Sequence, residues 1–247
     1  MKRALLLFVL ALPLYAQDLA QWNRILATYY SPAHGMDYRA LKARDMATVQ
    51  SLRQQLGKVN VAALDRKSQL AHWINVYNVN TVATILEHYP VDSIRDISTD
   101  PIIRLNVFKK DRVPLGGAKV SLDAVENQKI REGFHDPRIH FAINCAAKSC
   151  PPIRPEAYAG AKLDAQLDDQ ARKFLSSTRF TRDGGTLVIH VTKIMDWFSG
   201  DFEKWGGGKA AFIRRYMSPD KQRLIDQAKE IEFDYDDYDW DLNDWKR

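Results

Sequence analysis

One long stretch between two helix signals constrains the fold more than any other part of the sequence. Residues 65–90 read DRKSQLAHWINVYNVNTVATILEHYP, in which Asp65 or Ser68 can cap a helix and Pro90 ends it. Apolar side chains recur at helical spacing along one broad face, namely Leu70, Trp73, Ile74, Tyr77, Val82, Ile85 and Leu86. This pattern predicts the main buried helix of the domain, around which the other elements must pack.

Three asparagines interrupt this apolar helix. Asn75, Asn78 and Asn80 lie within six residues, although asparagine has a poor intrinsic helix propensity. If they are buried, their side-chain amides need hydrogen-bond partners. We expect them mainly to tie neighbouring loops to the helix. One of them could instead face an active cleft, and we take Asn78 as the candidate substrate-binding residue.

The other periodic segments place helices first, and mixed strands and helices later. Helical spacing predicts helices over 17–30 and 42–57, a short helix from Ser121, and further helices from Glu156, over 196–204, up to Met217 and over 220–230. Alternation and turn residues predict strands near 103–108, 112–114, 138–145 and 186–191, turns at Gly116-Gly117 and Asp183-Gly184-Gly185, and a final strand in the acidic, aromatic tail from Ile231. This order predicts a single α+β domain, with N-terminal helices followed by a small mixed or antiparallel sheet packed with helices.

The N-terminus has the layout of a secretory signal peptide. Lys2 and Arg3 precede an uncharged apolar run from Ala4 to Leu12. This run is too short to span roughly 30 Å of hydrocarbon, so we expect no stable membrane insertion once residues 1–16 are removed. We therefore expect one domain over 17–247 in an exported protein that is periplasmic or secreted.

The charge and the cysteine content exclude several classes of protein. Removing Lys2 and Arg3 lowers the formal charge from +5 to +3, and acidic and basic residues are interleaved along the rest of the chain. No basic stripe with interleaved aromatics is present, so we expect no nucleic-acid partner. Two cysteines are too few for a fold built on disulfides, so the core must come from apolar packing. The expected partner is a small molecule, a peptide or another exported protein.

The two cysteines lie five positions apart in HFAINCAAKSCPPIRPEAY, residues 140–158. A metal site is disfavoured because the thiol spacing is wider than the close ligand pairs of zinc sites, and we expect neither a metal nor another cofactor. A Cys145–Cys150 disulfide is feasible if the two Cα atoms approach within about 4.4–6.8 Å. The third interpretation is a free catalytic thiol with a histidine base.

The catalytic interpretation assigns Cys150 as the nucleophile and His140 as its base. On a regular strand over 138–145, His140 and Cys145 would face opposite sides, so Cys145 is the poorer partner. Cys150, stiffened by the Pro151-Pro152 pair, could fold back toward the imidazole. Glu126 or its neighbour Asn127 could orient the histidine, and of the two we assign Glu126.

Arg138 and Arg154 are the candidate contacts to an anionic group of the substrate, because a guanidinium presents several donors to a carboxylate in a fixed geometry.

Several blocks of the sequence, in this order, resemble the domain of unknown function 547 family. The blocks are HWINVYNVNTVATIL (72–86), YPVDSIRDI (89–97), LGGAKVSLDAVEN (115–127), DPRIHFAINCAAKSCPPIRPEAY (136–158), KIMDWFSGDF (193–202) and YDWDLN (238–243). The resemblance implies a single α+β domain of a type found in bacterial exported proteins and in plant proteins, without a secure activity. A papain- or transglutaminase-like fold is one form such a domain could take. In those folds the cysteine usually precedes the histidine strand, so their residue roles do not transfer to His140 and the later cysteines.

Two hypotheses of function follow from these residues. The first is a thiol-dependent hydrolase or acyl-transferase acting on amide or thioester bonds, with Cys150, His140 and Glu126 as catalytic residues. The alternative is a non-catalytic periplasmic module that binds a peptide, a cell-wall fragment or another protein and has a Cys145–Cys150 disulfide.

Overall fold

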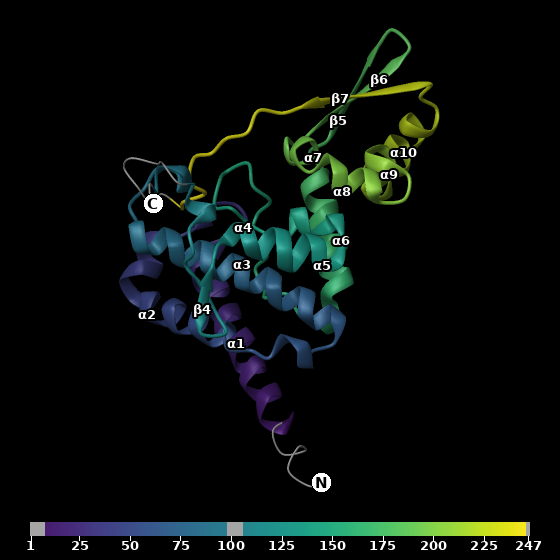
Figure 1. Ribbon diagram of the computed structural model, residues 1–247. Helices are drawn as coiled ribbons and strands as arrows, with labels where there is room; N and C mark the ends of the chain where they lie inside the picture. The colour runs from purple at the N-terminus through teal and green to yellow at the C-terminus, as the bar shows by residue number, and fades with distance from the viewer. Residues whose placement is uncertain (1–7, 98–105, 246–247) are drawn as a thin grey trace, which may run out of the picture.

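The computed structural model describes residues 8–97 and 106–245, with side chains from residue 19 onward. In Figure 1 a helical body carries a smaller lobe of strands and short helices, and the chain returns from this lobe to the body near its C-terminus. The protein is therefore a single α+β domain, as the order of elements predicts.

The helical body is built around the predicted central helix. α3 (Arg66–His88) is capped by Asp65, whose carboxylate accepts from the backbone N–H groups of Lys67 and Ser68. Every residue from Leu70 to Leu86 is buried, which is why this segment could not be a surface helix. The long helices α1 (Phe8–Tyr29) and α2 (Tyr38–Leu56) belong to the same helical body (Figure 1).

The segments around α1 and α2 differ from the prediction at their ends. α2 begins at Tyr38 instead of residue 42, because the Asp37 carboxylate accepts from Ala40 N at 2.9 Å and caps the helix there. A two-residue ladder pairs β1 (Tyr30–Ser31) with β2 (Gly35–Met36) ahead of it. Residues 1–7 of the predicted signal peptide lie outside the described residues. No helix in the described ranges combines the length and apolar character needed to cross a bilayer.

The 3₁₀ turn η1 (Val61–Ala63) joins α2 to α3. Short elements follow α3, namely the 3₁₀ turns η2 (Ile94–Asp96) and η3 (Val107–Lys109), the hairpin strands β3 (Val113–Leu115) and β4 (Ala118–Val120), α4 (Leu122–Ala124), the π-helix η4 (Val125–Arg131), α5 (Glu132–Phe134), and the 3₁₀ turns η5 (Pro137–Phe141) and η6 (Gly160–Lys162). The Gly116-Gly117 turn joins β3 to β4, and both glycines have a positive φ. The strand predicted near 103–108 is wrong in its described part, where Val107–Lys109 is a 3₁₀ turn.

The predicted strand over 138–145 is also wrong. Residues 137–141 form η5 instead, capped by the Asp136 carboxylate, which accepts from Arg138 N. Ile139 packs in the core of the helical body, whereas Phe141 packs in the core of the lobe. The chain therefore turns at the junction of two hydrophobic clusters, where a tight helix can bury successive apolar residues in different directions and a flat strand cannot.

The lobe contains a three-stranded sheet of mixed direction. β5 (Arg179–Asp183) pairs antiparallel with β6 (Thr186–Val191) across the predicted turn, and β7 (Glu230–Tyr235) pairs parallel with β6. Leu187, Ile189 and Val191 alternate inward with the period of a half-buried strand. Helix α6 (Leu163–Leu175) links the two parts, because Leu163 and Leu167 pack in the core of the body and Leu175 packs in the core of the lobe. Helices α7 (Ile194–Trp197), α8 (Ser199–Lys204), α9 (Gly208–Tyr216) and α10 (Pro219–Asp226) complete the lobe. The small mixed sheet packed with helices confirms the predicted fold class.

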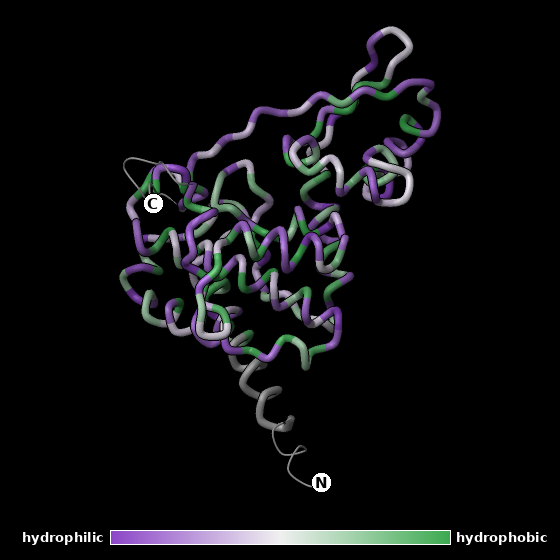
Figure 2. The backbone as a smooth tube through the Cα atoms, viewed as in Figure 1, coloured by the Kyte–Doolittle hydropathy of each residue, from purple (hydrophilic) through white to green (hydrophobic). Residues whose placement is uncertain are grey.

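After β7 the chain leaves the lobe and returns to the helical body. We call residues 236–245 the return segment; it is the extended yellow connection in Figure 1, and Figure 2 shows it as largely hydrophilic. It is not the continuation of the predicted final strand, because only isolated bridges form there, Leu242 with Ala147 and Asp244 with Met36. Leu242 is buried in the core of the body. The return segment thus closes the molecule over the loop that contains the cysteines.

Candidate active site

A pocket of about 310 Å³ lies between the helical body, the cysteine loop, the lobe and the return segment. Its lining includes Tyr77 from α3, Glu126 and Arg131 from the π-helix, His140 from η5, both cysteines, Trp197 and Phe198 from the lobe, and Tyr238 and Trp240 from the return segment. The three residues assigned as catalytic from the sequence, Cys150, His140 and Glu126, therefore line one pocket. Cys145 lines it as well.

The loop between the cysteines is held by buried hydrogen bonds. The Asn144 side chain donates to Pro151 O at 2.7 Å and accepts from Ala146 N at 2.9 Å, so it ties both ends of the loop together. Cys150 N donates to Ala147 O, which closes the turn. Ala146, directly after Cys145, has a φ of 66°, a conformation that costs a residue with a β-carbon free energy. The surrounding hydrogen bonds therefore hold Ala146 in this strained conformation, directly after Cys145.

The two thiols are both free, so the disulfide of the alternative hypothesis is not formed in this structure. They lie close together: Cys150 Sγ accepts a hydrogen bond from Cys145 N at 2.9 Å. Cys150 is buried, whereas Cys145 is partly exposed to the pocket. The Tyr238 hydroxyl lies 3.2 Å from Cys145 Sγ.

The surroundings of the two sulfurs shift their pKa values in opposite directions. A hydrogen bond from the Cys150 thiol lowers the pKa of Cys145, and the Tyr238 hydroxyl adds to this effect against the opposing effect of burial. Burial raises the pKa of Cys150 well above its ordinary value, and its interaction with Cys145 raises it further. Because the thiolate is the nucleophilic form of cysteine, Cys145 is the more reactive of the two.

His140 is held by a carboxylate from the lobe. Its Nε2 lies 2.8 Å from Asp201 Oδ2, and Arg131 binds both oxygens of Asp201, at 2.7 and 3.1 Å. Phe198 stacks on the imidazole with ring centroids 4.0 Å apart. Burial lowers the pKa of His140. Hydrogen bonds from His140 and Arg131 hold the pKa of Asp201 well below its usual range, so Asp201 is an anion that accepts a hydrogen bond from the Nε2–H of His140.

This arrangement leaves the other imidazole nitrogen as a base. His140 Nδ1 is buried and has no hydrogen-bond partner in the described part of the chain. With the proton on Nε2, Nδ1 has a free lone pair in a residue that lines the pocket. The predicted hydrogen bond between His140 and Cys150 is therefore not formed, and the group that orients the histidine is Asp201 instead of Glu126.

Glu126 interacts with a different partner. Its carboxyl forms a hydrogen bond with the Tyr77 hydroxyl, which favours the anion, but burial is the larger effect and raises the pKa of Glu126 to about 7. The π-helix η4 places this side chain in the pocket together with Arg131, and π-helical turns are often found at functional sites. Glu126 is thus a partly buried carboxyl that can hold or release a proton near neutral pH.

The three residues assigned as substrate contacts lie elsewhere. Arg138 is bound by Asp136, Asp164 and Asp168, beside a separate hollow. Arg154 is paired with Glu156 and Asp169. Neither arginine lines the pocket of the cysteines. Carboxylates of α6 and its neighbours bind their guanidinium groups instead.

Asn78 is buried under the cysteine loop. Its amide donates to Ala142 O at 2.9 Å and its oxygen accepts from Asn144 N at 2.8 Å. Asn75 bonds the backbone of Tyr158 in the same reciprocal way. These asparagines therefore have the loop-tying role expected for them, and the geometry gives Asn78 no open contact to a substrate.

Sequence reasoning missed Asp201 and Tyr238. Asp201 is sixty-one residues from His140, and Tyr238 is ninety-three residues from Cys145. Nothing in local spacing links such distant residues, although Asp201 lies in the block KIMDWFSGDF and Tyr238 in the block YDWDLN, on both of which the family resemblance rests. Within the described ranges, no group of three or more His, Cys, Asp or Glu side chains is placed to hold a metal ion.

Comparison with known proteins agrees with that resemblance. Residues 61–175 match the family model described as "Protein of unknown function, DUF547". No curated protein and no solved structure matches the chain, so the likeness to papain or transglutaminase folds stays an expectation. The matched segment contains α3, the π-helix, η5 and both cysteines, whereas Asp201 and Tyr238 follow it in the chain.

Proposed function

We propose that this chain, which over residues 61–175 belongs to the family of proteins of unknown function DUF547, is a thiol-dependent hydrolase or acyl-transferase that acts on amide or thioester bonds. One observation carries the proposal. A free thiol with a lowered pKa and a histidine with an unpartnered Nδ1 line the same pocket, and a carboxylate fixes the histidine from its other side. This is the combination that nucleophilic catalysis by cysteine requires.

Cys145 is the nucleophile in this proposal, in place of Cys150. The argument from strand geometry that disfavoured Cys145 no longer applies, because η5 is not a strand. Cys150 is the buried sulfur with a raised pKa, and its thiol proton stabilises the anion on Cys145. Cys150 therefore supports the nucleophile by a hydrogen bond, as does Tyr238.

The acyl transfer has two halves. In the first, the Cys145 sulfur forms a bond to the substrate carbonyl carbon and its proton passes to His140 Nδ1. The imidazolium then returns that proton to the departing amine or thiolate, which leaves a thioester on Cys145. In the second half, water or an acceptor attacks the thioester, its proton goes to Nδ1, and the Cys145 sulfur regains it on leaving. Asp201 stabilises the imidazolium in both halves.

The location and the partners are part of the proposal. We propose that residues 1–16 are a signal peptide and that the exported protein is periplasmic or secreted. The proposed substrate is a small molecule, a peptide or part of another exported protein.

The acyl-enzyme is the species that tests this function. The protein is incubated with 4-nitrophenyl acetate, and the acetyl group is located by peptide mass spectrometry. We expect it on Cys145 in the wild type and in Cys150→Ser, and on no residue of the pocket in Cys145→Ser. In His140→Asn the acetyl group should persist about 100-fold longer or more, because a general base contributes about 10²–10⁴ to such a step. Acetylation of neither cysteine, or of Cys150 alone, would contradict the proposal and favour a binding module.

The lowered pKa of Cys145 gives a second test, which needs no substrate. The alkylation rate of Cys145 by iodoacetamide should rise with pH to a midpoint below that of free cysteine. Tyr238→Phe removes the hydroxyl donor and should slow alkylation at pH 7 by about tenfold, since a hydrogen bond to a charged group contributes about 1.5–3 kcal/mol. Tyr235→Phe, on the same part of the chain but without a contact to the sulfur, is the control and should alkylate as the wild type does.

A further inference from the structure

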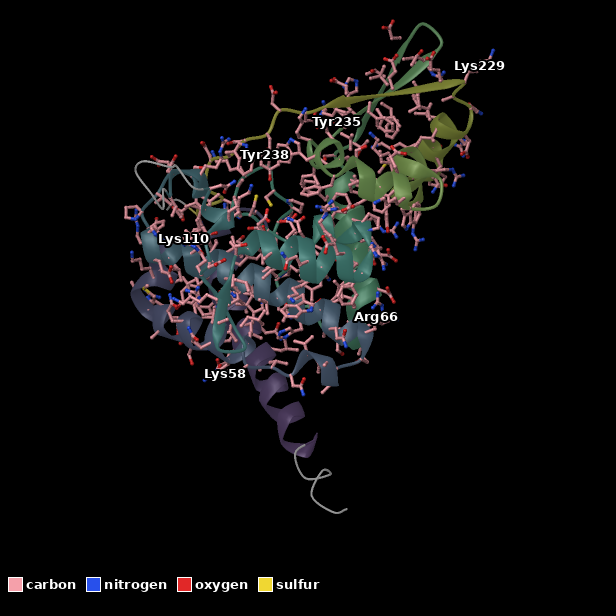
Figure 3. The ribbon with its side chains drawn as sticks, viewed as in Figure 1. Lys58, Arg66, Lys110, Lys229, Tyr235 and Tyr238 are labelled. Atoms are coloured by element: carbon pink, nitrogen blue, oxygen red, sulfur yellow. The ribbon has the colours of Figure 1, made fainter. Side chains whose placement is uncertain are left out.

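Three aromatic rings form a cluster at the mouth of the pocket. Trp197 from α7 lies with its ring centroid 4.8 Å from that of Tyr238 and 5.8 Å from that of Trp240, and the rings of Tyr238 and Trp240 are 4.7 Å apart. Figure 3 labels Tyr238 on the extended segment between the lobe and the body, which is where the cluster forms. We call these three residues the aromatic rim.

The aromatic rim has an exposed surface that the fold does not use. Trp197 is 45% exposed, and it is the large hydrophobic side chain that stands out in this way among the described residues. Exposed apolar surface beside a cavity is typical of a ligand-binding site. The rim borders the pocket that contains Cys145, so a ligand held there would have its neighbouring atoms next to the sulfur.

The charges of the pocket indicate which kind of ligand fits the rim. Asp123 and Glu126 both line the pocket, and Arg131 is the basic side chain among the described lining residues. Arg131 is neutralised by its two bonds to Asp201. The carboxylate of Asp123 and the partly ionised Glu126 then leave the described lining of the pocket with a net negative charge.

The return segment also carries acidic side chains outside the rim. Asp237 and Asp239 flank Tyr238 and are both exposed, and Asp239 is paired with Lys148 at 3.8 Å. The rim also holds one cation of the protein itself, because the Arg95 guanidinium lies 5.0 Å from the centroid of the Trp240 ring. Aromatic faces beside carboxylates attract cations, both by the ring quadrupole and by charge.

We propose that the aromatic rim of Trp197, Tyr238 and Trp240 binds a cationic group of the substrate, an alkylammonium or a guanidinium, next to the acyl bond that Cys145 attacks. The proposal rests on the proposed function, for which it names the substrate class. An anionic substrate would face the charge of Asp123, and a neutral sugar would gain from the rings but not from the carboxylates. A cationic acyl donor or amine acceptor gains from both.

The experiment compares two thioesters of the same shape. Acetylthiocholine has a trimethylammonium group where S-(3,3-dimethylbutyl) thioacetate has an uncharged tert-butyl group. Binding of each to the Cys145→Ser protein is measured by the change in tryptophan fluorescence, so that no turnover is needed. We expect the cation to bind about 2- to 30-fold more tightly, which corresponds to about 0.5–2 kcal/mol for a cation–π contact.

Variants connect that preference to the rim. Trp197→Leu keeps an apolar side chain but removes the ring, and Asp123→Asn removes the charge, so each should lower the preference for the cation toward one. Glu132→Gln removes an exposed carboxylate that does not line the pocket and should leave the preference unchanged. Equal binding of the two thioesters by the Cys145→Ser protein, or tighter binding of methyl glucoside than of acetylthiocholine, would overturn the inference.

The two proposals can fail separately. A preference for the cation in Cys145→Ser, without any acetyl-enzyme in the wild type, would leave a cation-binding pocket and remove the thiol enzyme. Turnover of both thioesters at the same kcat/KM would keep the enzyme and remove the cationic substrate class.

Discussion

At the scale of single residues, chemically identical groups differ in this protein because their neighbours differ. Cys145 and Cys150 belong to one short loop, yet Cys145 receives hydrogen bonds from Cys150 and Tyr238 whereas Cys150 loses its hydration. Asp201 and Glu126 diverge in the same way. Asp201 accepts hydrogen bonds from His140 and Arg131 and stays ionised. For Glu126, burial raises the pKa by more than the hydrogen bond from the Tyr77 hydroxyl lowers it.

Glu126 predicts a pH dependence of the free energy of unfolding. Its pKa is about 7 in the folded protein and about 4.5 in the unfolded chain. Between these values the folded state holds a proton that the unfolded state has released, so stability falls as pH rises from about 4.5 to 7. Glu126→Gln has no carboxyl group that ionises, so it should be more stable than the wild type at pH 8, by about 1–3 kcal/mol.

Urea unfolding at pH 5 and pH 8 measures the Glu126 effect. The gain in stability of Glu126→Gln over the wild type should be larger at pH 8 than at pH 5. Glu132→Gln, a change at an exposed glutamate in the helix that follows, should show no such difference. An equal effect of Glu126→Gln at both pH values would mean that Glu126 is not protonated in the folded protein near neutrality.

At the scale of elements, the pocket depends on how α3 holds the chain around η5. The segment 142–144 leads directly into Cys145 and forms no regular secondary structure. Two of its backbone groups, Ala142 C=O and Asn144 N–H, are bound by the Asn78 side chain in place of a sheet ladder. The Asn78 side chain, in the middle of a buried helix, thus supplies hydrogen bonds that a neighbouring strand would supply in a sheet. It does so because a buried backbone group must find a partner.

Asn78→Ala is therefore expected to destabilise the protein. It leaves the buried Asn144 N–H and Ala142 C=O without their partner, and each unsatisfied group costs about 1–3 kcal/mol. We expect the free energy of unfolding in urea to fall by about 2–4 kcal/mol. Asn80→Ala is the comparison, because the Asn80 side chain donates to Val76 O within α3, accepts from Arg53 of α2 and does not reach this loop.

The alkylation rate of Cys145 separates local from global effects in the Asn78 test. In Asn78→Ala the rate should change, because the segment before Cys145 loses its attachment. In Asn80→Ala it should remain that of the wild type. A stable Asn78→Ala protein with unchanged Cys145 reactivity would show that the loop is held by other contacts, such as those of Asn144.

At the scale of the whole molecule, two hydrophobic clusters meet at the pocket and the return segment joins them again. His140 stands between Ile139, in the core of the body, and Phe141, in the core of the lobe. The return segment crosses from β7 to the body, where Leu242 is buried and bonds to Asp92 O. On the way it hydrogen-bonds the cysteine loop, with Asp241 O accepting from Lys148 N and Asp239 O from Ser149 N. The pocket is complete only when both connections hold.

Leu242→Ala tests this second connection. Truncating a buried leucine should lower the free energy of unfolding by about 2–5 kcal/mol. The amides of Lys148 and Ser149 should also exchange faster in hydrogen-exchange mass spectrometry, because the return segment opens locally. Leu175→Ala, at a leucine buried in the lobe, should cost similar stability without this local effect. Equal protection of residues 148–149 in both variants would contradict the role given to the return segment.

Local patterns explain which parts of the fold the sequence could predict. The buried helix over 65–90, the turn at Gly184-Gly185 and the strand over 186–191 were confirmed, because periodicity and turn residues act over a few positions. The strand over 138–145 was wrong because its apolar alternation reflects burial in two different clusters. Periodicity alone cannot distinguish a strand with one buried face from a tight turn between two cores.

The sequence by itself determined the central helix and named residues that line the pocket. It singled out Cys145, Cys150, His140 and Glu126, and these residues share one pocket. Only the tertiary structure decided which residues contact one another. Asp201, and not Glu126, binds His140, and Tyr238 lies beside Cys145. The cysteine with the lowered pKa is Cys145 and not Cys150. The reason is physical. A residue type sets what a side chain can do, but hydration, hydrogen-bond donors and nearby charge are supplied by segments far away in the chain, and these decide which side chain does it.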